Sequence, residues 1–295
     1  MNVGHLYAVL AALLFGAYLV LYKRYFGTYP TMPYMVGVYG SALAWYLPIG
    51  VITWPDGRAL AGTVTSPEAL GALVAAALLT GVAVAVSLLA VNRGEVSYVA
   101  PLNKLVPLFV LPIEVLALGQ HLGPLQVVGV LVATAGVYLA NYHSGALLAP
   151  FRRALTYPPA QLALFGAALF GVVDVTKRVL LQELALPVPL VVWLGLLGIL
   201  AVSLPLGRRR FDALPRRAYP GIVAMGLLVA VVNHTTALAF QTIPASVASP
   251  IINAQAVVAV VLGGLLLDEG RSRSASPPAS SRRWASASSR SPDAL

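Results

Sequence analysis

Three polar side chains interrupt an otherwise apolar stretch in the first half of the chain. Residues 96–120 form a run long enough to cross a bilayer, yet this run contains Asn103, Lys104 and Glu114. In a helix that rises about 1.5 Å per residue, a span that starts with this run places Lys104 about 12 Å inside, near the midplane. A charge at that depth costs at least about 2.5 kcal/mol and usually faces the protein interior. We therefore expect Lys104 to bind an anionic group of a substrate, with a structural ion pair to Glu114 or Asp174 as the alternative.

Two carboxylates inside apolar segments are candidates for proton coupling, because a group that accepts and releases a proton can drive transport. Glu114 and Asp174 are these candidates. The alternative for Glu114 is an ordinary carboxylate near the membrane boundary. The alternative for Asp174 is a local ion pair with Lys177 or Arg178, which follow it by three and four residues on the same helix face.

Amide, imidazole and phenol side chains in the apolar segments are further candidates for substrate binding, since each of them hydrogen-bonds polar groups. These candidates are Asn103, Tyr98, Asn233, His234, Asn253 and Gln255. For His234, a buried histidine bonded to a neighbouring helix is an equally good interpretation. Tyrosine is also the ordinary residue of the membrane interface, which is the alternative for Tyr98.

The chain contains an internal repeat, which links several of these candidates. A shift of 149 residues places Lys104 on Asn253 and aligns several Ser, Pro and Leu residues around them. A Leu-Phe-Gly sequence at residues 14–16 recurs at residues 169–171, at an offset of 155. The repeat therefore sets Asn253 and Gln255 opposite Lys104, as polar walls of the same cavity.

The composition is that of a membrane protein. Of the 295 residues, 59% are hydrophobic and 10% are charged, whereas a soluble domain carries about 25% charged residues. The absence of cysteine excludes disulfides and thiolate catalysis, and the four histidines have no metal-binding spacing, so we expect no cofactor. The net charge of +9 includes five arginines in the last 25 residues. Basic membrane-side loops explain the remaining charge better than nucleic-acid binding.

Hydropathy predicts nine membrane-spanning helices and thus an all-α, polytopic membrane protein. The first repeat, residues 1–142, holds five of them, and the second, residues 159–269, holds four, with a polar linker at 143–158. Repeats with an odd number of helices must lie in opposite orientations, which is the inverted-repeat design of many secondary transporters. The predicted spans are residues 6–22, 34–54, 69–91, 96–120, 125–142, 160–181, 188–206, 219–240 and 246–267.

Residues 270–295 differ from the rest of the chain. They are mostly Ser, Arg, Ala and Pro without periodicity, and we expect them to be disordered. A tenth helix is due at this point of the second repeat. We hypothesise that a shifted reading frame replaced this helix; a native basic tail on a nine-helix protein is the alternative.

Small residues in the third predicted span indicate close helix packing, because Gly and Ala let helix backbones approach each other in membranes. The residues concerned are Gly71, Gly81 and Ala85. We expect all three to face other helices rather than lipid.

A recurring turn and the repeated Leu-Phe-Gly sequence together indicate a family. The turn after the fourth predicted span reads Leu-Gly-Gln-His-Leu-Gly-Pro at residues 118–124, and a second copy reads Leu-Leu-Asp-Glu at 266–269. This order of motifs resembles the EamA family of the drug/metabolite transporter superfamily. The resemblance covers residues 1 to about 270 and implies ten helices and export or exchange of small metabolites, often amino acids or related solutes. Two features depart from the family: Gln120 stands where an acidic residue is usual, and the tenth helix is missing.

The membrane orientation has two conflicting indications. Counted over alternate loops, Lys and Arg gather on the side where the first predicted span ends, and the positive-inside rule assigns that side to the cytoplasm. This rule places the N-terminus outside the cell. The family resemblance implies an N-terminus inside the cell.

These observations predict a secondary transporter of small metabolites in the plasma membrane that works by alternating access. Its expected partners are a small-molecule substrate and the lipid bilayer, with a proton or a counter-substrate for coupling and no nucleic acid. Two alternatives stay open: a membrane-embedded enzyme acting on lipid, and a structural membrane protein that transports nothing. Because the sequence contains no catalytic motif, we expect no enzymatic activity.

Overall fold

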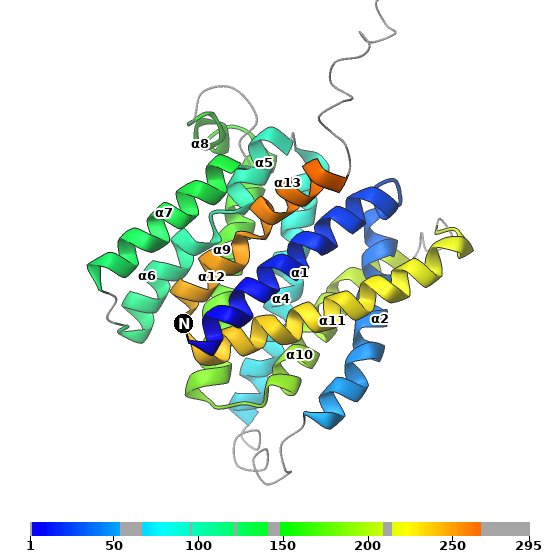
Figure 1. Ribbon diagram of the computed structural model, residues 1–295, viewed down its shortest axis with the longest axis horizontal. Coiled ribbons are helices and arrows are strands. Elements are labelled where there is room, and N and C mark those ends of the chain that lie inside the picture. The colour runs from blue at the N-terminus through cyan, green and yellow to red at the C-terminus, as the bar shows by residue number, and fades with distance from the viewer. Residues whose placement is uncertain are drawn as a thin grey trace, which may run out of the picture.

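The computed structural model describes residues 2–53, 67–94, 96–120, 123–140, 148–208 and 214–266. Within these ranges every regular element is helical (Figure 1). The elements are α1 (Val3–Phe26), α2 (Thr31–Ile52), α4 (Pro67–Arg93), α5 (Val96–Asn103), α6 (Val106–Leu118), α7 (Pro124–Ala140), α8 (Ala149–Ala154), α9 (Pro158–Arg178), the π-helical turn η1 (Val179–Glu183), α10 (Val188–Gly207), the 3-10 turn η3 (Arg216–Ala218), α11 (Tyr219–Thr242), α12 (Ala245–Asn253) and α13 (Gln255–Leu266). The predicted tail, residues 270–295, and with it the hypothesis of a shifted reading frame, lies outside the described residues.

Proline marks where many of these helices begin. Pro124 and Pro158 are the first residues of α7 and α9, while Pro30, Pro187 and Pro244 directly precede α2, α10 and α12. A proline ring fixes φ near the helical value, and the missing N–H has no partner at a helix start anyway. The start of a helix is therefore readable from the sequence at these five positions.

Six helical segments in the described part are long and apolar enough to cross a membrane. They are Val3–Phe26, Thr31–Ile52, Leu70–Ala90, Val99–Leu118, Val188–Gly207 and Arg216–Thr242. The apolar helices Val127–Leu139 and Ala245–Ala259 are shorter. Each of the nine predicted spans overlaps helical residues in the described part of the chain, but the count of nine membrane crossings stays a prediction.

Two of the predicted spans are not continuous helices. The expected helix at residues 96–120 breaks between α5 and α6, at Lys104 and Leu105, where the Lys104 N–H bonds the Pro101 carbonyl three residues back. Pro107 explains this break, because it has no N–H for the Asn103 carbonyl four residues earlier. The expected helix at 246–267 breaks between α12 and α13 at Ala254, and no proline follows to explain that break. The two breaks fall at positions related by the 149-residue shift.

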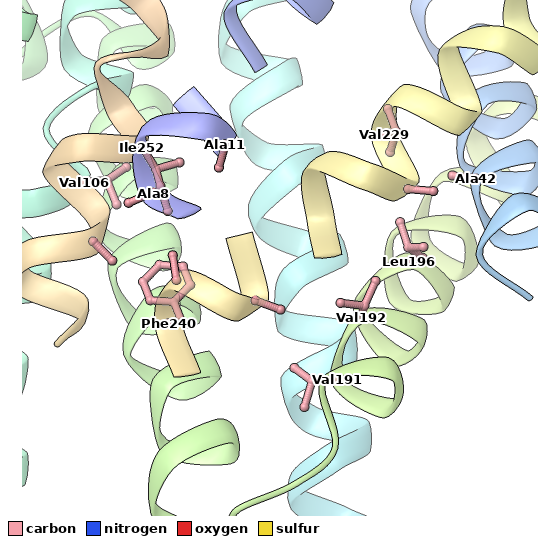
Figure 2. Packing of buried hydrophobic residues seen from close by; sticks show 14 of the residues in the cluster. Ala8, Ala11, Ala42, Val106, Val191, Val192, Leu196, Val229, Phe240 and Ile252 are labelled. Carbon is pink, nitrogen blue, oxygen red and sulfur yellow. The ribbon is translucent and has the colours of Figure 1, made fainter. Parts of the chain in front are cut away.

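The first helix of each repeat, α1 or α9, packs against the broken helix of the other repeat. α1 packs against α11, α12 and α13, whereas α9, which begins the second repeat, packs against α4, α5 and α6. α2 and α10 contact each other; α2 also packs against α11, and α10 also packs against α4 and α11. Figure 2 shows Ala8 of α1 together with Val106 and Ile252, which flank the two breaks and belong to the same buried cluster.

The repeated Leu-Phe-Gly sequence lies at two close approaches to the broken helices. A methyl group added at Gly16 of α1 would lie 2.5 Å from Val258 Cγ1 of α13. A methyl group added at Gly171 of α9 would lie 2.7 Å from Phe109 Cβ of α6. Phe109 and Val258 are related by the same 149-residue shift as the breaks. Glycine recurs in this motif because any larger residue would push each broken helix away from its neighbour.

The packing prediction for the third span is confirmed at Gly81 and wrong at Gly71. A methyl group at Gly81 would clash with the Gly198 carbonyl of α10 and lie 2.7 Å from Val202 Cγ2. Gly71 is exposed and has open space around it, while Ala85 is half-buried. Each residue turns a helix by about 100°, so ten residues carry Gly71 to a different face from Gly81.

This contrast gives a matched pair of variants. We expect Gly81→Leu to lower the free energy of unfolding in detergent by about 1–3 kcal/mol, because the leucine must displace the α10 backbone. Gly71→Leu should change it by no more than about 0.5 kcal/mol, since nothing surrounds that position. Chemical denaturation followed by circular dichroism measures both. Equal effects of the two substitutions would contradict the assigned α4–α10 contact.

Candidate functional site

Asn103 and Lys104 lie at the break between α5 and α6, inside the helical bundle. Both residues are half-buried, and the Asn103 Oδ1 atom is fully enclosed without a hydrogen-bond partner. Among the described residues, no carboxylate lies within 4.0 Å of the Lys104 ammonium. The break therefore presents an ammonium and an amide oxygen that the protein leaves without partners in its described part.

The carboxylate of Glu114 is engaged away from Lys104. It is completely buried, and its two oxygens accept the backbone N–H groups of Ala245 and Ser246 at 2.7 and 2.8 Å. These are the first two residues of α12, so Glu114 caps the N-terminus of that helix from α6. This contact gives Glu114 a structural role; its part in proton coupling stays a prediction.

Arg178 and Gln182 complete the surroundings of Glu114. Arg178 Nε lies 3.6 Å from Glu114 Oε1 and donates to Gln182 Oε1 at 3.0 Å. Gln182, in the π-helical turn, donates to the Phe240 and Ile243 carbonyls at 2.6 and 2.9 Å. We call Glu114, Arg178 and Gln182 the cap cluster. It ties the ends of α6, α9 and α11 to the start of α12.

Asp174 belongs to a different polar group, which reaches the second helix break. Ser249 Oγ donates to Asp174 Oδ2 at 2.7 Å, and Asn253 Nδ2 donates to the Ser249 carbonyl at 2.9 Å. The Lys177 ammonium, one turn along α9, interacts electrostatically with Asp174. Gln255, just past the break, has a buried Oε1 atom without a hydrogen-bond partner.

The side chains at the two breaks come from elements that touch one another. α9, which carries Asp174, packs against α5 and α6, and α12, which carries Asn253, packs against α6 and α9. Both breaks therefore adjoin helices that pack against one another, and the common cavity of Asn103, Lys104 and Asn253 stays a prediction.

Lys177 lines two small cavities that α9 forms with α4 and α10. Each has a volume of about 20 Å³, and both are lined by Lys177, Thr80, Val191 and Gly195. Asn233, Thr236 and Ala237 of α11 also line the second. A cavity of this size holds roughly one water molecule, so no metabolite fits there in this conformation.

The remaining candidates have local partners or lie outside the described side chains. The His234 ring Nδ1 is 2.8 Å from the Tyr46 hydroxyl of α2, an interaction between neighbouring helices. Asn233 Nδ2 donates to the Val229 carbonyl of its own helix at 2.9 Å. The position of the Tyr98 side chain is outside what the structure describes.

Sequence reasoning missed several polar residues of this region. Ser249 links Asp174 to Asn253, and Lys177, considered only as an ion-pair partner of Asp174, lines the small cavities. The four-residue spacing of Ser249 and Asn253 was available as a signal, because residues four apart share a helix face. Thr80 carries no such signal, since its neighbours at the cavity come from other helices.

Comparison with known proteins supports a relationship for the first half of the chain. Residues 2–142 match the sequence profile of the EamA-like transporter family. This half of the chain is therefore similar to EamA-like transporters. With six apolar helices among its described residues and an EamA-like first half, the chain is a multi-pass membrane protein with a transporter-like fold. No curated protein matches the sequence.

The similarity of fold to known structures extends beyond the matched half of the chain. The chain superposes on the crystal structure of another protein with a TM-score of 0.69 and 17% sequence identity. The superposition covers 94% of this chain and 90% of the other. At this identity the similarity establishes the all-helical fold alone.

Proposed function

We propose that the protein is a secondary transporter that moves small metabolites across the plasma membrane by alternating access. The observation that carries the proposal is the pair of breaks at Lys104 and Ala254, which lie at repeat-related positions inside the bundle. Broken helices at corresponding places of two inverted repeats typically form the substrate site of secondary transporters. The EamA-like first half supports the same function, since members of this family are transporters.

The helix neighbours support an inverted repeat. Exchanging the two halves maps the packing of α1 against α12 and α13 onto the packing of α9 against α5 and α6. The same exchange maps the Gly16–Val258 approach onto the Gly171–Phe109 approach. Two equivalent halves around a central site are what rocking between two conformations requires.

The side chains at the breaks favour a substrate with both an anionic and a hydrogen-donating group. Lys104 has no ion-pair partner among the described residues and suits a carboxylate or phosphate. The buried Oδ1 of Asn103 and Oε1 of Gln255 lack donors and suit an ammonium or amide N–H. Amino acids and related solutes carry both groups, so we place the substrate in that class.

Asp174 is the better candidate for proton coupling. Its carboxylate is half-buried and bonded to the Ser249 hydroxyl beside the second break, where a change in its charge reaches the substrate site. The carboxylate of Glu114, in contrast, holds the start of α12.

Flux into proteoliposomes tests the proposal. Purified protein is reconstituted into liposomes loaded with unlabelled amino acids, and uptake of radiolabelled amino and organic acids is measured with and without a pH gradient. We expect uptake above that of protein-free liposomes for at least one zwitterionic or anionic solute. Absence of flux for every solute, together with a change in the liposome lipids, would favour a lipid-modifying enzyme instead. Absence of both would leave the structural membrane protein.

A further inference from the structure

A cavity of about 460 Å³ lies between the end of α1 and the start of α11, away from the helix breaks. This volume falls within the roughly 300–1,000 Å³ typical of small-molecule pockets. The two helices meet at Gly4 and Thr242 and diverge toward their other ends (Figure 1). The cavity is lined by Leu21, Tyr25, Phe26, Tyr29, Arg217, Ala218, Gly221, Ala224 and Met225.

The cavity lies at the level where a spanning helix leaves the membrane. Lys23 and Arg24 occupy the last turn of α1, and Arg216 and Arg217 form the turn before α11. Tyr25 beside them is 57% exposed and packs under the Arg24 guanidinium. Basic and tyrosine side chains gather at the headgroup level of a bilayer, so the cavity opens at that level.

The lining of this cavity divides into a charged rim and an apolar floor. Arg217 is exposed at the rim. Among the described residues, no acidic one lines the cavity and none forms an ion pair with Arg217. The floor consists of Leu21, Phe26 and Met225, of which the last two are buried. A guanidinium is the side chain best suited to a phosphate diester, and an apolar floor suits hydrocarbon.

We propose that this cavity binds an anionic phospholipid of the surrounding bilayer. The lipid phosphate contacts Arg217, the hydroxyls of Tyr25 and Tyr29 face the glycerol region, and the first part of one acyl chain lies on the apolar floor. A free phosphate ion gains nothing from Leu21, Phe26 and Met225, which favours the lipid as occupant. This site is independent of the proposed transport function, since it shares no residue with the helix breaks.

Native mass spectrometry of the detergent-purified full chain tests the proposal. The protein is incubated with equimolar phosphatidylglycerol and phosphatidylcholine that carry the same acyl chains. We expect phosphatidylglycerol to be retained preferentially, and Arg217→Gln to lower its apparent affinity about fivefold, the effect of one basic residue at an anionic membrane surface. The matched control is Arg216→Gln, which removes an adjacent exposed arginine that does not line the cavity and should leave retention unchanged.

A second variant tests the apolar floor. Ala224→Phe places a ring in the cavity without changing its charge, and we expect it to lower retention of phosphatidylglycerol as well. Three results would overturn the proposal: equal retention of the two lipids by the unmodified protein, equal losses in Arg217→Gln and Arg216→Gln, or displacement of the lipid by inorganic phosphate. The last would identify a site for a free anion instead.

Discussion

Replacing Glu114 with glutamine is expected to lower the free energy of unfolding by about 3–5 kcal/mol, the usual cost of removing one partner of a buried ion pair. The carboxylate is completely buried and accepts two N–H groups of α12 while lying 3.6 Å from Arg178 Nε. In the glutamine variant, one of the accepting oxygens becomes an NH₂ group, which cannot accept a hydrogen bond. One α12 N–H then loses its buried acceptor, and the Arg178 guanidinium loses its buried counter-charge.

The control for this prediction uses the other carboxylate that contacts the same arginine. Glu183 Oε1 lies 3.1 Å from Arg178 Nη2, but the Glu183 side chain is 52% exposed. We expect Glu183→Gln to cost no more than about 1 kcal/mol, as is usual for exposed ion pairs. Urea denaturation in detergent, followed by tryptophan fluorescence, compares the two. A Glu114→Gln protein as stable as Glu183→Gln would show that the α12 cap contributes little.

Replacing Lys104 with methionine is expected to reduce transport about 10- to 100-fold, provided that the protein is a transporter. Methionine keeps the length of the side chain and removes its charge. A hydrogen bond to a charged group contributes about 1.5–3 kcal/mol, and this range corresponds to that loss of substrate affinity. The assay is uptake into proteoliposomes at substrate concentrations below saturation. Because Lys104 has no ion-pair partner among the described residues, the variant should fold normally.

Two further variants separate a role in binding from a general loss of charge. Lys23→Met removes an exposed lysine from the last turn of α1 and should leave uptake unchanged. Asn253→Leu alters the repeat-related position and should also reduce uptake. Full transport by Lys104→Met would refute the proposed anion site at the first break.

Much of the helical layout was predictable from the sequence, because apolar length and proline at helix starts are local properties. The break at Lys104 was also encoded locally, since Pro107 removes the N–H that would bond the Asn103 carbonyl. It was missed because hydropathy alone, the basis of the span prediction, carries no information about backbone hydrogen bonds. The break at Ala254 has no such local cause, and the internal repeat was the available indication of it. Gly71 was assigned to a contact that its helix face does not make.

Contacts between polar groups of the candidate site were predictable when both groups lie on one helix. They were unpredictable when the partners come from distant segments of the chain. On α12, the four-residue spacing of Ser249 and Asn253 indicates their shared face, whereas the placement of Asn253 opposite Lys104 stays a prediction from the repeat. The partners of Glu114 are backbone N–H groups, which every residue possesses and which no residue type signals. In the same way, Thr80 and Asn233 line one cavity because α4 and α11 both lie beside α9, a consequence of packing alone.

The contact between Glu114 and α12 has a consequence for biosynthesis. At roughly 5–20 residues per second, a ribosome needs about ten seconds to add the 131 residues that separate Glu114 from Ala245. During that interval the carboxylate is in the membrane without its final partners, although Arg178 emerges about halfway through it. The first half of the protein therefore reaches its final structure only after most of the second half has been inserted. The two halves, however similar, do not mature independently.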